Sequence, residues 1–288
     1  GPEREETILQ ELNSEHAFFN GLPSYEIANF DITCINTVVK GQSSSGWTLD
    51  RRISTGREFF CLGFVLSGEG IYQFENHSDC HVEKCDILFL NKGERYFAKN
   101  GKKEAYSYIV VDFDCTNETF VKSLFHSSKI TVRNPMQYEA IFSLLEKEWK
   151  KRSPIRLLKA KSILFEILYR IMSQKLFENY PQKKLTKISP ALQYLHDHYT
   201  DSVINVDYLS QLCGFSVVHF RRLFREIYNM SPNEYIQQLR LERAKDLLNS
   251  GFFTVSEVAE QCGFSNVYYF SRFFKKHAGI PPSDYSTG

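Results

Sequence analysis

Two clusters of basic side chains near the C-terminus have the spacing of helical faces. The first cluster is Arg221, Arg222 and Arg225, and the second is Arg272 and Lys275. Residues three or four apart lie on one side of an α-helix, so each cluster would present its positive charges in one direction. Guanidinium and ammonium groups arranged in this way neutralise phosphates, and an arginine can also donate two hydrogen bonds to a guanine base. The clusters therefore predict two surfaces that bind a polyanion.

Each cluster belongs to a repeated segment. Cys213-Gly214-Phe215-Ser216 precedes the first cluster, and Cys262-Gly263-Phe264-Ser265 precedes the second. After each segment, side chains recur at i, i+3, i+4 and i+7, which is typical of one packed helix face. These side chains are Phe220, Leu223, Phe224 and Ile227 in the first copy and Phe270, Phe273, Phe274 and His277 in the second. We therefore expect two amphipathic helices with basic outer faces.

A short helix is expected before each basic helix. Thr254 and Glu257 have the spacing of a capping box, and Asn205 is the expected N-cap of the first copy. Gly214 and Gly263 end these short helices, because glycine adopts the left-handed conformation of a tight turn. A short helix, a glycine turn and a basic second helix make a helix-turn-helix unit.

A longer helix is predicted between the two units. It starts at a capping box formed by Ser231 and Glu234, with Pro232 at its first position, and it ends at Gly251. A helix of about 18 residues spans roughly 27 Å. Such a rod could hold two recognition helices about one turn of DNA apart, which is ~34 Å.

With these features, residues from about 188 to 286 resemble the DNA-binding domain of the AraC/XylS family of bacterial transcription regulators. The repeat, the connecting helix and the ending Pro281-Pro282-Ser283-Asp284-Tyr285 carry the resemblance. It implies that the partners are double-stranded DNA and RNA polymerase, with activation of transcription as the usual outcome. An ordinary helical bundle with solvated basic faces is the alternative. The DNA-binding residues implied by the resemblance are Val218, Arg221, Arg222, Arg225, Val267, Tyr268, Tyr269, Arg272 and Lys275.

Composition sets broad limits on the whole chain. The 288 residues suffice for two domains, and 42% hydrophobic residues fit a globular protein. From residue 183 onward 12 basic residues stand against 10 acidic ones, so the basic signal lies in the clusters rather than in the net charge. No apolar run approaches the ~20 residues of a membrane span, and we expect a cytoplasmic protein without a membrane partner. The odd number of cysteines, seven, predicts reduced thiols.

The N-terminal half has the pattern of a β-domain. Short apolar or alternating runs such as Phe60–Leu66, Asp86–Leu90 and Tyr106–Phe113 are separated by Gly, Asn and Ser, which predicts an antiparallel barrel or jelly roll. A segment from Cys85 to Asn100 resembles the second cupin motif. It has Tyr96 where metallocupins have a histidine ligand, so we expect no metal, no cofactor and no enzyme. A cupin-type isomerase or dioxygenase remains a remote alternative.

Four possible zinc ligands, His77, Cys80, His81 and Cys85, lie within nine residues. Their spacing fits no common zinc site, and successive side chains of a strand point to opposite faces. The resemblance instead implies a pocket for a small organic effector, with a sugar as one candidate. By position, the side chains that could line it are Arg52, Tyr72, Tyr96 and Tyr108. The alternatives are structural tyrosines and a constitutive regulator whose barrel only dimerises.

Residues 136–180 have helical periodicity, with a break near Pro154. Relatives in this family often pair there, so we expect a homodimer, and packing within one chain is the alternative. The second helix has a broad apolar face, formed by Leu157, Ala160, Leu164, Ile167, Leu168, Ile171 and Met172.

The sequence as a whole predicts an α+β multidomain chain. The expected parts are an N-terminal arm (1–23), a cupin-like antiparallel β-barrel that senses a ligand (24–135), a helical dimerisation region (136–180), a linker (181–190) and an all-α domain with two helix-turn-helix units joined by a linker helix (191–288).

Overall fold

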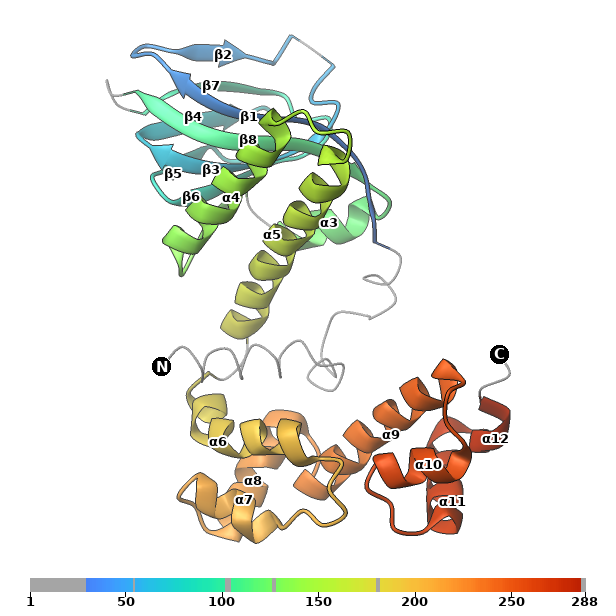
Figure 1. Ribbon diagram of the computed structural model, residues 1–288. Helices are drawn as coiled ribbons and strands as arrows, with labels where there is room; N and C mark the ends of the chain where they lie inside the picture. Colours follow the sequence, from blue (N-terminus) through green and yellow to red (C-terminus); the bar gives the residue numbers. More distant parts are fainter. Residues whose placement is uncertain (1–29, 54, 102–104, 126–127, 180–181, 286–288) are drawn as a thin grey trace. The chain divides into compact units, whose positions relative to one another are not determined.

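The computed structural model describes residues 30–53, 55–101, 105–125, 128–179 and 182–285 (Figure 1). The expected N-terminal arm therefore lies outside the described residues. The described chain forms two compact units, one ending at Lys175 and the other beginning at Leu176. We call them the N-terminal unit and the C-terminal unit.

The N-terminal unit contains two antiparallel sheets. The first has the strand order β1-β8-β3-β6-β9 and the second has the order β2-β7-β4-β5. The strands are β1 (Ile32–Ser43), β2 (Thr48–Asp50), β3 (Phe60–Ser67), β4 (Glu69–Phe74), β5 (Cys80–Glu83), β6 (Asp86–Leu90), β7 (Tyr96–Asn100), β8 (Tyr106–Cys115) and β9 (Lys129–Thr131).

Alternation along the first sheet separates two cores. On β3, Phe60 and Phe64 belong to a core shared with the helices, whereas Cys61 and Val65 belong to a core with residues of the second sheet. A strand that is buried on both faces reads as a continuous apolar run, because neighbouring side chains point in opposite directions. The predicted antiparallel β-domain is confirmed.

Three helices follow strand β8 in the N-terminal unit. They are α3 (Glu118–Leu124), α4 (Pro135–Lys150) and α5 (Arg156–Asn179), of which the last four residues belong to the C-terminal unit. The break near Pro154 is confirmed, whereas α3 was not predicted. Helix α4 contacts β1, β3 and β8, and α4 and α5 contribute to the same core against the first sheet (Figure 1).

The C-terminal unit consists of helices. They are α6 (Gln182–His198), α7 (Val206–Leu212), α8 (Val217–Tyr228), α9 (Pro232–Ser250), α10 (Val255–Gln261), α11 (Val267–Ala278) and α12 (Pro282–Tyr285). The side chain of Asn205 accepts a hydrogen bond from Asp207 N, as an N-cap does, and both predicted capping boxes are present. Helix α9 ends at Gly251, whose φ is +71°. The predicted all-α domain with two helix-turn-helix units is confirmed.

The expected linker at 181–190 differs from the structure. Residues 182–190 form the first half of α6, in which Leu185 and Ile188 are fully buried. Pro190 was taken as the end of the linker, but it lies inside α6. It cannot donate to the carbonyl of Thr186, and Ser189 Oγ donates to that oxygen instead, at 3.0 Å. Among the described residues, no helix is both long and apolar enough to cross a membrane.

Candidate nucleic-acid interface and effector site

Helix α8 presents the first basic cluster to solvent. The N-cap Ser216 accepts a hydrogen bond from His219 N and so fixes the start of the helix. Arg221, Arg222 and Arg225 are exposed on the outer face. Val218 also points outward and is 80% exposed. The inner face consists of Phe220, Leu223, Phe224 and Tyr228, whereas Ile227, which was predicted there, is only half-buried.

Helix α11 presents the second cluster in the same way. Its N-cap Asn266 accepts hydrogen bonds from Tyr268 N and Tyr269 N. Arg272 and Lys275 are exposed, and Tyr268 and Tyr269 are 78% and 49% exposed. The buried face consists of Phe270, Phe273 and Phe274.

One position on α11 differs from the prediction. His277 was expected on the packed face, but it is exposed, and its Nδ1 lies 2.8 Å from the carbonyl oxygen of Phe273. Val267, for which a DNA contact stays a prediction, is half-buried and packs against the core of the second helix-turn-helix unit. Tyr268 and Arg272 are therefore better placed than Val267 to reach a ligand.

The outer faces are positive in spite of one acidic group on α8. Glu226 accepts a hydrogen bond from Lys184 at 2.7 Å and lies 4.0 Å from Arg222 Nε. The hydrogen bond from Lys184 lowers the pKa of Glu226, so this carboxylate is charged and already paired. Helix α11 contains Arg272, Lys275 and Lys276 and no acidic residue. Both faces can therefore attract phosphates.

The two turns of the helix-turn-helix units are built by glycines with positive φ. Gly214 has φ +69° and Gly263 has φ +79°, a conformation that favours glycine. The cysteines before them are not equivalent: Cys213 is half-buried, whereas Cys262 is fully buried. Burial raises the pKa of the Cys262 thiol to about 11.

The core between the two sheets contains tyrosines that were predicted to line a pocket. The Tyr72 and Tyr106 hydroxyl oxygens lie 3.2 Å apart, and Arg57 Nη1 donates to the Tyr96 hydroxyl at 3.1 Å. Burial raises the pKa values of Tyr72, Tyr96 and Tyr106, so all three are neutral donors at neutral pH. The ring of Tyr108, which is half-buried, lies 5.0 Å from that of Tyr106.

Arg52 does not join these tyrosines. It is exposed, pairs with Asp50 at 2.7 Å and covers the ring of Phe97 at 5.0 Å. The arginine inside the unit is Arg57, whose Nη2 lies 2.6 Å from an Asp112 carboxylate oxygen. Its Nε is buried and makes no hydrogen bond in the structure. Arg57, whose Nη1 donates to the Tyr96 hydroxyl, therefore keeps an uncommitted N–H donor at Nε.

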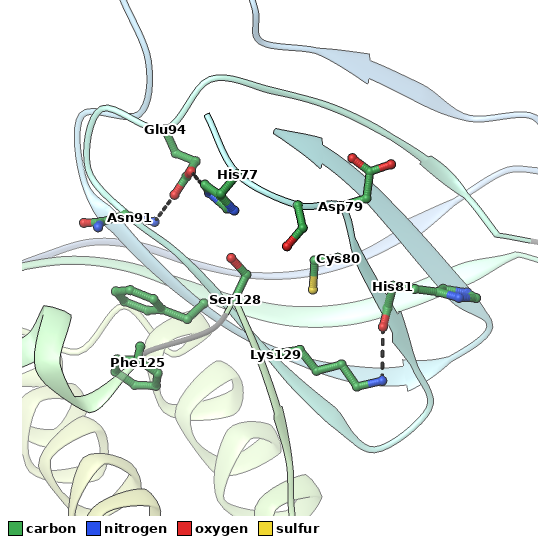
Figure 2. A pocket seen from close by; sticks show the side chains of 11 residues that line it. His77, Asp79, Cys80, His81, Asn91, Glu94, Phe125, Ser128 and Lys129 are labelled. Carbon is green, nitrogen blue, oxygen red and sulfur yellow. Dashed lines mark hydrogen bonds and ion pairs between the residues drawn. The ribbon is translucent and has the colours of Figure 1, made fainter. Parts of the chain in front are cut away.

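A separate cavity of about 450 Å³ lies between the β4–β5 turn, the β6–β7 loop and β9 (Figure 2). Phe89 and Phe125 stack at 4.1 Å on one side of it. Figure 2 shows Glu94 and His77 pointing toward one another, and His77 Nε2 lies 2.5 Å from a Glu94 carboxylate oxygen. Carboxylate, amide and aromatic groups together suit a polar, hydroxylated molecule. The lining residues are His77, Ser78, Asp79, Cys80, His81, Phe89, Asn91, Glu94, Phe125, Ser128 and Lys129.

The histidines among the four possible zinc ligands each contact a carboxylate. His77 pairs with Glu94, and His81 lies 3.1 Å from a Glu69 carboxylate oxygen. Cys85 has φ +75°, a backbone conformation that is uncommon for residues other than glycine. Among the described residues, no three His, Cys, Asp or Glu side chains converge on one metal position.

Both units match models of known protein families. The family model of the AraC-like ligand binding domain matches residues 40–167, and that of a helix-turn-helix domain matches residues 209–288. The raffinose operon transcriptional regulatory protein RafR of Pediococcus pentosaceus is 24% identical over 237 residues, which cover 80% of this chain and 85% of RafR. The HTH-type transcriptional activator RhaR of Mannheimia succiniciproducens is 30% identical over 162 residues, 55% of this chain and 57% of RhaR.

The chain belongs to the AraC family of transcription regulators. Among solved structures, unsaturated fatty acid bound ToxT from Vibrio cholerae is similar to it, with a TM-score of 0.35 and 15% identity over 89% of this chain and 96% of ToxT. Helix-turn-helix domains of the AraC family bind DNA. In this AraC-family chain, α8 and α11 are the second helices of the two units, which is the position of a recognition helix.

Several residues of this AraC-family chain were missed from the sequence. Arg57 and Asp112 lie 55 residues apart and form an ion pair that no local pattern indicates. Tyr106 lies two residues before Tyr108 on β8, so strand alternation places both on the same face, but only Tyr108 was predicted to line a pocket. Glu94 lies in a loop, where no period exists to predict its direction.

Proposed function

We propose that this AraC-family protein activates transcription from a DNA site with two half-sites, under the control of a small organic effector bound by the N-terminal unit. The observation that carries the DNA part is geometric. Two exposed, basic helix faces belong to units joined by one continuous helix, α9, of 19 residues. At 1.5 Å per residue this helix is about 28 Å long, close to the ~34 Å between successive major grooves on one face of DNA.

The exposed side chains divide between two roles. Arg222 and Arg272 supply guanidinium groups that can pair with guanine, and Tyr268 adds an aromatic surface for base or methyl contacts. Arg225 and Lys275 lie about one turn further along their helices and are placed to neutralise phosphates. Phosphate contacts give affinity that depends on salt, whereas base contacts give the choice of sequence.

The names of the relatives support the regulatory part. RhaR is named as an activator, and RafR is named as the regulator of a raffinose operon. A sugar therefore remains the first candidate for the effector. The polar groups inside the N-terminal unit, Arg57 and Tyr96 among them, offer hydrogen bonds of the kind that hydroxyl groups need.

A constitutive regulator is the second candidate. This candidate is favoured because side chains occupy the interior between the two sheets. Tyr72, Tyr96 and Tyr106 are 6%, 2% and 1% exposed. Tyr72 and Tyr106 are hydrogen-bonded to each other, and Tyr96 is hydrogen-bonded to Arg57. Buried tyrosines with satisfied hydroxyls can serve only as packing.

A screen of metabolites by melting temperature, with pure sugars included, separates the two candidates. An effector-controlled protein gains melting temperature with one compound. Tyr96→Phe should abolish the gain if the compound lies in the interior, whereas Glu94→Gln should abolish it if the compound lies in the cavity of Figure 2.

For the DNA part, we expect the wild-type chain to select a duplex from a random pool and to release it as salt is raised. A chain that selects no sequence contradicts the proposal.

A further inference from the structure

The side chain of Arg240, at the middle of α9, bridges the two helix-turn-helix units. Arg240 Nε donates to the carbonyl oxygen of Tyr199 at 2.7 Å, and Nη2 donates to that of Asp201 at 2.5 Å. Both carbonyls belong to the connection between α6 and α7, in the first unit. Arg240 Nη1 donates to the carbonyl oxygen of Gly263 at 3.2 Å, in the turn between α10 and α11 of the second unit. One guanidinium thus holds backbone atoms of both units.

The same turn packs directly on the α6–α7 connection. A Cβ atom at Gly263 would lie 2.5 Å from the carbonyl oxygen of Thr200, so only glycine allows this approach. The Arg240 guanidinium also covers the ring of Phe264 at 5.6 Å. Phe264 in turn packs on Phe270, the first buried residue on the inner face of α11, with 5.1 Å between ring centroids. The contact therefore reaches the base of the second recognition helix.

The fork of the guanidinium explains why arginine occurs here. Arginine has five N–H donors in a fixed plane and stays protonated in proteins, so it can bridge three carbonyls that point at one spot. Burial lowers the pKa of Arg240, which means that water has been removed from around the charge. A shorter or apolar side chain would leave these carbonyls without their donor.

We propose that Arg240 is a positioning residue that fixes the angle and distance between α8 and α11 and thereby sets the spacing of the two DNA half-sites. Helix α9 alone fixes only the separation of its ends. A tie from the middle of α9 to both the α6–α7 connection and the α10–α11 turn also fixes the rotation of one unit relative to the other. Arg240 acts through the backbone and does not contact DNA. This inference rests on the proposed binding of two half-sites.

The test uses the full chain and a duplex that the wild-type protein selects from a random pool, compared with the same duplex carrying one extra base pair between the half-sites. One base pair moves the second half-site by ~3.4 Å and turns it by roughly 34°. The wild-type protein should lose about tenfold in affinity on the longer duplex, the cost of a misplaced contact. Arg240→Met should bind both duplexes within about threefold of each other, and Arg240→Lys should recover part of the preference.

Two controls separate positioning from other effects. Arg243→Met removes the same charge from an exposed place on α9 and should keep the tenfold preference. The dependence of affinity on salt should not change in Arg240→Met, whereas loss of a phosphate contact would lower the slope by about one ion. If Arg240→Met does not fold, the Arg240→Lys ratio decides.

Different results would contradict the role of Arg240 and the proposed binding of two half-sites. A folded Arg240→Met or Arg240→Lys protein that keeps the wild-type preference for spacing overturns the role of Arg240. A wild-type protein that selects a duplex with one half-site, or none, contradicts the two-site proposal itself.

Discussion

At the scale of single residues, the proposed recognition of DNA depends on the outward arginines. Arg222 and Arg272 are exposed on equivalent faces of α8 and α11. Replacing either with alanine should cost ~1–3 kcal/mol on the selected duplex and much less on random DNA, because a lost base contact affects only the correct sequence. Titrations of both duplexes by fluorescence anisotropy measure this difference. Equal losses on the two DNAs would identify the arginines as phosphate contacts.

The buried thiol and phenols of the N-terminal unit predict a loss of stability at alkaline pH. Burial raises the pKa of Cys61 from its ordinary value of 9.0 to about 12, and it raises the pKa values of Tyr96 and Tyr106. The unfolded chain releases these protons at lower pH than the folded chain. The stabilisation is therefore complete below pH 9 and is lost as pH rises toward 12.

For Cys61 alone, the free energy of unfolding should fall by roughly 2 kcal/mol between pH 8 and pH 11. Urea titrations at both pH values measure it. Cys61→Ala should unfold more easily at pH 8 but should show a smaller fall. A free energy that does not change with pH would contradict the buried, neutral state of these groups.

The sequence predicted the outward residues of α8 and α11 better than the interior of the N-terminal unit. A helix with large apolar side chains at i, i+3 and i+4 has one packed face, so the direction of Arg222 follows from its position. Arg52 and Arg57 lie in a segment without regular strand or helix. No period exists there, and only the fold decides that Arg57 meets Tyr96 while Arg52 stays outside.

At the scale of elements, α5 shows how a broad apolar face divides between two uses. Leu164, Ile167 and Ile171 are buried within the N-terminal unit, so the part of the stripe first considered for pairing packs inside one chain. A second row remains outside: Leu158, Phe165 and Tyr169 are 73%, 38% and 49% exposed. Their separations of seven and four residues place them on one side of the helix.

If α5 pairs two copies of the chain, this outer row forms the contact. Leu158→Asp should then convert the dimer to a monomer with little change in melting temperature, because it places a charge in an apolar interface. Lys159→Asp, on an adjacent exposed position, should leave the dimer intact. Sedimentation at micromolar concentration measures the difference. A wild-type chain that sediments as a monomer removes the prediction.

Leu164→Asp is the matching test of the inner face. Leu164 is fully buried, and an unpaired carboxylate there costs several kcal/mol, so the N-terminal unit should unfold rather than dissociate. Periodicity predicted that α5 is apolar on one broad side. Which part of that side meets the sheet depends on where α4 packs, and the sequence of α5 alone does not determine the position of α4.

Helix α6 is a second element whose extent required the structure. Residues 181–190 were expected to form a linker, but Leu185 and Ile188 are fully buried in the C-terminal unit. Ser189 satisfies the carbonyl that Pro190 leaves without a partner. A proline is usually read as a break, and here a local hydrogen bond makes it compatible with a continuous helix.

At the scale of the whole molecule, regulation requires that effector binding and DNA binding each depend on the arrangement of the chain. An effector changes transcription only if it binds two arrangements with different affinities. By linkage, a compound that tightens DNA binding by a given factor must itself be bound more tightly by that factor when DNA is present. Calorimetric titrations of the compound, with and without the selected duplex, measure this equality. A compound that binds tightly and leaves DNA affinity and transcription unchanged shows that the N-terminal unit is not the sensor.

The central claim is that α8 and α11 each occupy a major groove on the same face of DNA. Hydroxyl-radical and methylation footprinting of the full chain on its selected duplex tests it most directly. We expect two protected segments whose centres lie about one helical turn, roughly 10.5 base pairs, apart, with guanine contacts in both. Arg222→Ala should remove the guanine contact in one segment, and Arg272→Ala should remove that in the other. A single protected segment, or protection that both variants lose together, would contradict the account.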